Sequence, residues 1–481
     1  MKIPRILLAA GASGSGKTLI TCGLLQALVD RGLKVASFKC GPDYIDPMFH
    51  SRVIGTQSAN LDTFFTSGEV TGYLLERNAS GCDIAVMEGV MGYYDGVGGT
   101  TTKASAYDLA AVTDTPVILI VNSKGMSLSL AAYIKGFLEY RENSHIAGVI
   151  FNQMSPMLYP RMKEQVETEL GISVLGYVPR ADDGVIESRH LGLVLPEEIP
   201  QLKDRLKKLA GVLENTLDME AVLRLAQAAP ELSVKENLSQ EEEAFGFHLP
   251  EPVRIGVARD EAFCFFYKDN FRLLTEMGAE LVYFSPVHDQ ILPGNLDGLL
   301  LYGGYPELKG RELEENSAMR NAIKNVIDRG MPCMAECGGF MYLHEEMEDM
   351  DGQMRQMAGV IHGKVFRTPR LTRFGYVYLE SRKGKPYGKI PAHEFHYFDS
   401  TSCGEDFRAC KPEGNRSWNC VHQEGALMAG FPHLYYYGNP RIPREFLMNC
   451  LNHKRKRTVG TQNGEQDPGN RCVPVRQEQK L

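Results

Sequence analysis

Near its start the chain carries a glycine-rich loop that leaves few folds open to it. Gly11, Gly16, Lys17 and Thr18 satisfy the pattern Gly-x4-Gly-Lys-[Ser/Thr], with Gly14 between them. The apolar run before the loop predicts a buried strand, and the residues after it predict an amphipathic helix. Backbone N–H groups of such a turn surround phosphate oxygens, and the helix N-terminus adds a favourable dipole. We therefore expect an ATP site in which Lys17 reaches the β- and γ-phosphates and the Thr18 hydroxyl ligates Mg²⁺.

Strand and helix patterns alternate through the first 195 residues. Apolar β-type runs occur at residues 5–10, 34–38, 84–87, 116–121 and 146–151. Helical patterns such as 18–30 and 128–139 lie between them. The alternation predicts an α/β fold whose mostly parallel sheet is covered by helices on both faces. We assign residues 1–195 to a P-loop domain that binds ATP and substrate.

The rest of the chain divides by composition into three parts. Residues 196–250 are rich in Leu, Lys, Glu and Gln and predict a helical connector. A strand pattern at 253–258 opens a second α/β domain, which we place at residues 251–452. Residues 453–481 are polar, lack apolar periodicity and begin with a basic run, so they predict a disordered tail.

Charge and cysteine usage exclude some classes of function. With 52 Lys+Arg against 60 Asp+Glu the formal charge is −8, which argues against a general nucleic-acid binder. No apolar run reaches the roughly 18–20 residues that span a bilayer. The 11 cysteines include no CxxC pair, which favours reduced thiols in a cytoplasmic protein. We expect no nucleic-acid or membrane partner, and we leave the oligomeric state open, with a homodimer as one option.

Two further segments of the first domain could complete the nucleotide site. Residues 83–88 form an apolar strand pattern that ends in Glu88, a candidate Mg²⁺ ligand whose alternative reading is a solvated acid at a strand end. Residues 39–47 are dense in Gly, Pro and Asp and follow a strand. That position is the carboxyl edge of a parallel sheet, where ligands bind, although the segment could equally be a plain turn.

The second domain contains a candidate nucleophile, Cys337. It lies between an apolar strand pattern and a helical pattern led by Gly338, as in a nucleophile elbow, and we expect the helix N-terminus to lower its pKa. A strand pattern about 30 residues earlier ends in Gly303 and Gly304. The backbone N–H groups of these three glycines could form an oxyanion hole. A buried, inert cysteine is the alternative interpretation.

A thiol nucleophile needs a base, and the second domain offers several histidines. The candidates are His362, His393, His396, His422 and His433. Residue chemistry alone does not choose among them. In glutamine amidotransferases of the triad type the histidine comes late in the chain, which favours His433.

Taken together, the motifs resemble the cobyrinate a,c-diamide synthase family over roughly residues 4–450. The matching stretches are residues 11–18, 39–50, 86–96, 188–193, 258–270, 302–307, 335–343 and 393–398. The resemblance implies a P-loop, dethiobiotin-synthetase-like domain joined to a class I, triad-type glutamine amidotransferase domain. It also implies a carbon–nitrogen ligase of cobalamin biosynthesis. Such an enzyme uses ATP and L-glutamine to amidate the a and c side-chain carboxylates of a corrinoid through an acyl phosphate.

The resemblance also assigns residues. By the family pattern Thr18, Asp43 and Glu88 are the Mg²⁺ ligands, Cys337 is the nucleophile and His433 raises its nucleophilicity. By charge and position, the candidate substrate contacts are Lys39, Tyr44, Asp46, Arg189 and His190.

The chain departs from the family pattern at three positions. Tyr435 stands where the family has a second histidine, and no acid follows two residues after His433, so Cys337 and His433 would act as a dyad. Ser188 precedes Arg189 where we expect an acid.

Three alternatives remain open from the sequence. The substrate could be another tetrapyrrole, such as nickel sirohydrochlorin or hydrogenobyrinate. The scaffold could perform a ligation like that of dethiobiotin synthetase, although a cysteine domain has no use in that reaction. The chain could also be a P-loop ATPase partner or regulator whose cysteine domain is vestigial, and a lack of glutaminase activity would favour this reading.

Overall fold

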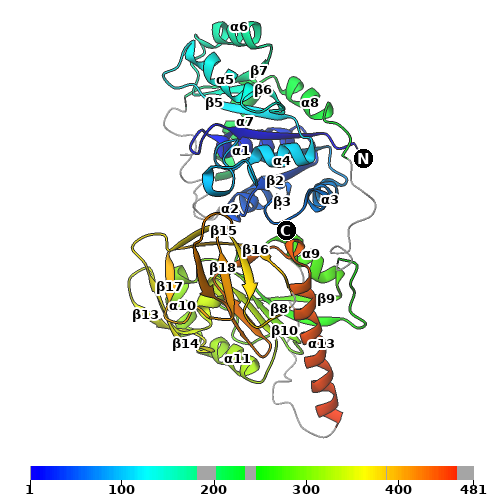
Figure 1. The fold of residues 1–481 in the computed structure, drawn as a ribbon, viewed down its shortest axis with the longest axis vertical. Helices are drawn as coiled ribbons and strands as arrows, with labels where there is room; N and C mark the ends of the chain where they lie inside the picture. Colours follow the sequence, from blue (N-terminus) through cyan, green and yellow to red (C-terminus); the bar gives the residue numbers. More distant parts are fainter. Residues whose placement is uncertain (1, 181–201, 233–244, 386, 463–481) are drawn as a thin grey trace. The chain divides into compact units, whose positions relative to one another are not determined.

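The computed structural model describes residues 2–180, 202–232, 245–385 and 387–462. It divides the chain into two compact units, Met1–Asn237 and Leu238–Lys480. Each unit has its own main sheet (Figure 1). Each also has its own set of buried apolar residues. In the described parts of the chain, no helix combines the length and the apolar character that crossing a bilayer requires.

The first unit is built on a seven-stranded sheet in the order β3-β2-β4-β1-β5-β6-β7, with every neighbouring pair parallel. Its strands are β1 (Arg5–Ala10), β2 (Val35–Cys40), β3 (Gln57–Leu61), β4 (Ile84–Glu88), β5 (Val117–Asn122), β6 (Ile146–Asn152) and β7 (Ser173–Val178). All six residues of β1 are buried, as expected for a central parallel strand with helices on both faces. The predicted parallel α/β fold is confirmed.

Helices cover this sheet (Figure 1). They are α1 (Lys17–Asp30), α2 (Ile45–Met48), α3 (Gly68–Ala79), α4 (Ala106–Thr113), α5 (Ser129–Glu139), α6 (Tyr159–Leu170), α7 (Leu202–Thr216) and α8 (Met219–Gln227). Helix α7 packs along α1 so closely that a Cβ atom on Gly23 would lie 2.7 Å from Leu213 Cδ1. Helix α8 packs against β1. The helices expected as a connector are therefore part of the first unit.

The second unit is organised around a six-stranded sheet in the order β20-β21-β11-β10-β8-β9. Its strands are β8 (Val253–Ala258), β9 (Ala279–Phe284), β10 (Gly298–Leu301), β11 (Cys333–Glu336), β20 (His422–Glu424) and β21 (Leu427–Gly430). Only β20 runs antiparallel to its neighbour in this sheet. The described helices of this unit are α9 (Lys268–Glu276), α10 (Gly310–Glu315), α11 (Ser317–Asp328), α12 (Gly338–Tyr342) and α13 (Arg441–Gln462).

The second unit also contains two smaller sheets that the sequence patterns did not predict. One has the order β13-β12-β14-β17, from β12 (His344–Glu348), β13 (Met354–Gln356), β14 (Ile361–Arg367) and β17 (Phe398–Ser400). The other has the order β19-β18-β15-β16-β22, from β15 (Arg373–Ser381), β16 (Ile390–His396), β18 (Phe407–Cys410), β19 (Ser417–Cys420) and β22 (His433–Leu434). This last sheet carries His393 and His396 on β16 and His433 on β22.

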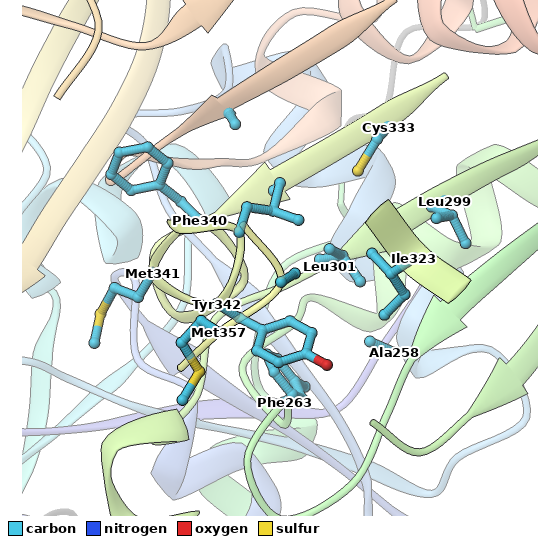
Figure 2. Packing of buried hydrophobic residues seen from close by; sticks show 14 of the residues in the cluster. Ala258, Phe263, Leu299, Leu301, Ile323, Cys333, Phe340, Met341, Tyr342 and Met357 are labelled. Atoms are coloured by element: carbon cyan, nitrogen blue, oxygen red, sulfur yellow. The ribbon is translucent and has the colours of Figure 1, made fainter. Parts of the chain in front are cut away.

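The core of the second unit includes Cys337 and apolar side chains of α12, the helix that follows it. Figure 2 shows part of this packing. Phe340 and Tyr342 of α12 are fully buried there, beside Leu301 and Phe263. Burying a side chain of this size contributes roughly 1.5–3 kcal/mol. The short helix after the cysteine is therefore anchored by its apolar face, which fixes the turn.

The predicted boundary of the tail was wrong. Helix α13 runs from Arg441 to Gln462, through the basic residues assigned to a disordered tail from residue 453. Arg457 Nη2 donates to Asp297 Oδ1 at 2.8 Å and Nη1 donates to Leu296 O at 2.6 Å. Asp297 is buried, so its charge holds the last turns of the helix against the unit. Residues 463–481 lie outside the described part of the chain.

Candidate functional site

The phosphate loop joins β1 to α1 as predicted. Gly14 and Gly16 have φ values of +75° and +91°, a left-handed conformation that disfavours side chains. Asn152 Nδ2 donates to Ser15 O at 2.9 Å, and a Cβ atom on Gly16 would lie 2.4 Å from that nitrogen. Gly16 is therefore required both by its backbone angle and by the close approach of Asn152.

Lys17 points back into the loop. Its Nζ donates to Ala12 O at 3.1 Å and to Met91 O at 2.5 Å. Burial, followed by repulsion from Lys39, lowers the pKa of Lys17 to about 8. A partly desolvated ammonium held by two carbonyl oxygens is well suited to exchange these contacts for phosphate oxygens.

A cluster of charged side chains lies where β2 and β4 end beside β1. Thr18 Oγ1 donates to Glu88 Oε1 at 2.5 Å, and Lys39 Nζ donates to the same oxygen at 2.8 Å. Lys39 Nζ also donates to Asp46, and His50 Nε2 lies 3.5 Å from Glu88 Oε2. The in-register pairing of β2 with β4 places Lys39 opposite Glu88 and so builds the cluster.

Charge balance keeps Lys39 and Glu88 ionised although they are buried, whereas burial and repulsion from Glu88 raise the pKa of Asp46 well above its ordinary value. Burial alone would lower the pKa of Lys39, but Asp46 and Glu88 outweigh it and the pKa lies well above its ordinary value. Burial alone would raise the pKa of Glu88, but Lys39 and His50 together hold it well below its ordinary value. Lys39 thus acts as an internal counter-ion for the acids.

The three residues predicted to bind Mg²⁺ are brought together. Thr18 contacts Glu88 directly. Asp43 Oδ2 lies 3.9 Å from Lys39 Nζ, and this ammonium group also contacts Glu88. Glu88 Oε2 is buried and accepts no hydrogen bond within the described residues. Hydroxyl and carboxylate oxygens are the donors that Mg²⁺ prefers, so the set fits this ion.

These residues would not enclose a metal by themselves. Within the residues that the structure describes, no cluster of three or more His, Cys, Asp or Glu side chains is arranged to hold a metal ion. Mg²⁺ is usually held by one or two carboxylates together with water and substrate phosphates. The arrangement therefore fits an ion that arrives with a nucleotide.

The predicted substrate contacts are placed in different surroundings. Lys39 and Asp46 are 5% and 2% exposed and contact each other, whereas Tyr44 is half-buried at the start of α2. Arg189 and His190 lie outside the described residues.

Cys337 lies in a sharp turn between β11 and α12. Its backbone has φ 47° and ψ −106°, an unfavourable conformation for a residue with a side chain. The Cys337 N–H donates to Gly430 O at 2.8 Å, which ties the turn to the end of β21. The predicted strand–turn–helix arrangement around this cysteine is present.

Three chain segments meet at this turn. A Cβ atom on Gly303 would lie 2.5 Å from His433 Cε1 and 3.5 Å from Cys337 Cβ. A Cβ atom on Gly338 would lie 3.1 Å from Gly304 N. The glycine turn after β10 therefore packs against both Cys337 and His433, and the Gly304 N–H group lies close to Gly338.

His433 is held on a short strand, β22. It pairs with His393 of β16, and the two rings stack with centroids 4.8 Å apart. Asn270 fixes the next residues, because its Nδ2 donates to Leu434 O at 2.9 Å and its Oδ1 accepts from Tyr436 N at 2.8 Å.

The other candidate histidines have different partners. His362 is 90% exposed and lies 3.0 Å from Glu345 Oε1. His396 stacks on Phe431, and His422 Nε2 lies 2.8 Å from Ser402 O. Proximity to Cys337 thus favours His433 as the base.

The expected low pKa of Cys337 is contradicted. Burial, followed by repulsion from Glu307, raises the pKa of the thiol above its ordinary value, and the N-terminus of a five-residue helix does not offset this. Burial also lowers the pKa of His433 to about 3. The thiol and the imidazole are therefore both neutral at rest.

Two side chains at these sites were not singled out from the sequence. His50 is fully buried against Glu88, and the only signal was its place in the motif at residues 39–50. Glu336 precedes Cys337 directly, and its Oε2 lies 3.8 Å from His433 Nδ1. An acid next to the nucleophile in sequence gave no sign that it also faces the base.

Comparison with known proteins identifies both halves. Residues 6–193 match the CobQ/CobB/MinD/ParA nucleotide binding domain, and residues 254–439 match the CobB/CobQ-like glutamine amidotransferase domain. The cobyrinate a,c-diamide synthase of Caldanaerobacter subterraneus subsp. tengcongensis is 37% identical, over 94% of this chain and 100% of its own length.

Two further proteins of the same name agree. The protein from Listeria innocua is 37% identical over 91% of this chain and 97% of its own length. The protein from Thermoplasma volcanium is 36% identical over 95% of this chain and 100% of its own length. The chain thus belongs to the cobyrinate a,c-diamide synthase family, and it is a carbon–nitrogen ligase with glutamine as the amido-nitrogen donor.

Proposed function

We propose that this protein amidates the a and c side-chain carboxylates of cobyrinate, a step of cobalamin biosynthesis, with ATP and glutamine. The observation that carries the proposal is the presence, in one chain, of a phosphate loop beside an acidic cluster and of a cysteine elbow beside a histidine. The first can activate a carboxylate, and the second can release ammonia. The described cysteines are free thiols, which supports a cytoplasmic setting.

Activation begins with the substrate carboxylate. One carboxylate oxygen attacks the γ-phosphorus of ATP, ADP leaves, and an acyl phosphate forms. A carboxylate resists attack by ammonia because its oxygen is a poor leaving group, and phosphorylation corrects this. Lys17 would exchange its two carbonyl partners for phosphate oxygens and offset their charge in the transition state.

Mg²⁺ would be held by Thr18, Asp43 and Glu88 together with the nucleotide phosphates. Bound there, the ion supplies positive charge to the phosphate oxygens. Lys39 would keep Glu88 ionised whether or not the ion is present.

Ammonia would come from the second unit. The Cys337 sulfur attacks the side-chain amide carbon of glutamine while His433 takes the thiol proton, and His433 then returns it to the leaving ammonia. N–H groups of Gly303, Gly304 and Gly338 would stabilise the oxyanion. Water hydrolyses the glutamyl thioester, which restores the thiol and releases glutamate.

The last step joins the two half-reactions. Ammonia attacks the acyl carbon, phosphate leaves with the former carboxylate oxygen, and an amide forms. Ammonia has to arrive unprotonated, so its route must be shielded from bulk water. Substrate carboxylates would be held by basic residues, for which Lys39, Arg189 and His190 are candidates, and Tyr44 and Asp46 are the other two candidate substrate contacts.

The proposal is tested by supplying cobyrinic acid, Mg-ATP and either glutamine or ammonium to wild type and to Cys337→Ala. We expect wild type to add two amides with either nitrogen source, and the variant to add them with ammonium only, as read by mass spectrometry. ATP and glutamine turnover without a corrinoid product would move the assignment to another tetrapyrrole, nickel sirohydrochlorin first.

The acyl phosphate has its own isotope test. When the substrate carboxylates carry ¹⁸O, each amidation should transfer one ¹⁸O atom to inorganic phosphate. Unlabelled phosphate would exclude the acyl-phosphate route.

A further inference from the structure

Glu336 is a buried acid for which the proposed chemistry has no use. It ends β11, directly before Cys337, and is 5% exposed. Its Oε2 lies 3.8 Å from His433 Nδ1 and accepts a long hydrogen bond of 3.4 Å from Leu434 N. Its Oε1 is buried and has no hydrogen-bond partner within the described part of the chain. A buried carboxyl with one unused oxygen calls for a functional explanation.

Both of these polar contacts of Glu336 are with β22, the strand that carries His433. The small pocket at this position is lined otherwise by apolar residues and glycine, including Leu379, Met428 and Leu434. No other ionisable side chain is among these lining residues. The two polar contacts of this carboxyl are thus with the base and with the residue that follows it.

We infer that Glu336 is the positioning residue of His433 in the proposed glutaminase reaction, an inference that rests on that proposed function. A carboxyl oxygen of Glu336 accepts the Nδ1–H of the imidazole. This fixes the tautomer in which Nε2 carries no proton and can take the thiol proton of Cys337, the role that an acid has in Cys-His and Ser-His triads.

The inference accounts for the missing triad acid. The residue two positions after His433 is Tyr435, whose O–H donates to Asp269 Oδ2 at 3.0 Å. Glu336 instead reaches the histidine from the end of β11, a strand of the six-stranded sheet. The separation of 3.8 Å exceeds an ordinary hydrogen bond, and such contacts tighten when substrate binds.

The charges at this place are compatible with the role. Burial raises the pKa of Glu336 to about 8, so the carboxyl is mostly neutral at pH 7 and accepts through its carbonyl oxygen. Tyr302, directly after β10, and Tyr436, in the segment after β22, interact with its charge. On the other side, His393 and His396 face His433.

Proton balance is simple in this arrangement. During attack the thiol proton moves to His433 Nε2, the imidazolium keeps Nδ1–H, and Glu336 keeps its own proton. The contact strengthens as the imidazolium forms, which stabilises the transition state more than the resting enzyme.

The test replaces Glu336 with leucine, which removes the acceptor, and with glutamine, which keeps an acceptor oxygen. We expect Glu336→Leu to lower the glutaminase kcat on the order of 10²–10³-fold with KM unchanged, and Glu336→Gln to lower it less. In the His433→Ala background, Glu336→Leu should cause no further loss, because a positioning residue acts only through its histidine. The ¹⁵N NMR spectrum of His433 should show Nδ1–H in wild type and a mixture of tautomers in Glu336→Leu.

Controls separate this role from a structural one. Met428 lines the same pocket, and Met428→Leu should leave the glutaminase kcat unchanged. Ammonium-dependent amidation should persist in each of these variants. If Glu336→Leu impairs folding, Glu336→Gln and its NMR spectrum carry the test. Wild-type kcat in Glu336→Leu, or an undiminished loss in the His433→Ala background, would overturn the inference. Glutaminase activity in Cys337→Ala would instead overturn the proposed function on which it rests.

Discussion

Burial and neighbouring charges together set the protonation states of Lys39, His433 and Cys337. The ammonium of Lys39 stays charged because carboxylates surround it, whereas His433 loses its charge because water is excluded. Cys337 keeps its proton for the same reason. The proposed nucleophile and the proposed base are thus both neutral in the resting protein.

The low pKa of His433 predicts an unusual pH dependence of the proposed glutaminase activity. The base must be neutral to accept a proton, and a pKa lowered to about 3 keeps His433 neutral well below its ordinary titration range. Glutaminase kcat/KM should therefore stay constant as the pH falls from about 7.5 to about 5.5. Steady-state glutamate release at each pH measures it, with circular dichroism to confirm that the fold persists. Half-loss near pH 6.5, the ordinary histidine value, would contradict the account.

The glycine turn gives a second prediction at this scale. Gly303→Ala places a methyl group 2.5 Å from His433 Cε1, so the ring must move and glutaminase activity should fall at least about tenfold. Ammonium-dependent amidation should persist. Gly294→Ala is the matched control, because no atom lies within 4 Å of its new Cβ. Equal glutaminase activity in the two variants would show that the turn does not position the base.

At the scale of elements, the ends of neighbouring strands bring distant residues together. The carboxyl ends of β2 and β4 deliver Lys39 and Glu88 to the start of α1, where Thr18 lies. The ends of β10, β11 and β21 meet in the same way around Cys337. Parallel strands put such ends on one edge, which is where α/β proteins bind ligands.

The position of Glu88 at the carboxyl end of β4 predicts that its charge affects the Mg²⁺ requirement of amidation. Glu88→Gln keeps the size of the side chain but removes its charge, so the Mg²⁺ concentration for half-maximal amidation should rise on the order of tenfold or more. The measurement is ammonium-dependent amidation across a Mg²⁺ series. Glu164→Gln, an exposed change on α6, should leave the requirement unchanged. An unaltered requirement in Glu88→Gln would remove this residue from the metal site.

Helix α13 predicts a stability effect. Arg457→Ala leaves the buried Asp297 carboxylate without its charged partner and should destabilise the second unit by about 1–3 kcal/mol. The chain has 1 tryptophan, Trp418 in β19, so its fluorescence during urea unfolding reports on this unit. Arg455→Ala breaks only an exposed pair with Glu251 and should change far less. Equal destabilisation by Arg457→Ala and Arg455→Ala would mean that the Arg457–Asp297 pair does not stabilise the second unit.

At the scale of the whole molecule, the sequence predicted what its local patterns encode. The apolar runs of β1, β4 and β8 and the two glycine-rich motifs were sufficient to predict both α/β units. Strand β3 was missed because it reads Gln-Ser-Ala-Asn-Leu, with polar residues that are buried only by the surrounding fold. The end of α13 was missed because its basic residues find partners far away in the sequence.

At the two sites, too, residues in local motifs were predicted, whereas contacts between distant segments were not. Cys337, Lys17 and Thr18 stand in motifs whose chemistry depends on adjacent residues, so spacing predicted them. The approach of Glu336 to His433 joins residues almost a hundred positions apart through strand packing, which a single sequence does not display. The enclosure of Lys39 by acids likewise depends on the register of β2 against β4.

The most direct measurement follows the nitrogen atom. Wild-type protein is given cobyrinic acid, Mg-ATP and glutamine labelled with ¹⁵N in its side-chain amide, and the corrinoid is examined by mass spectrometry. The account predicts a product with two new amides, both labelled, and one ADP formed for each amide. Unchanged cobyrinic acid beside accumulating glutamate and ADP would contradict it.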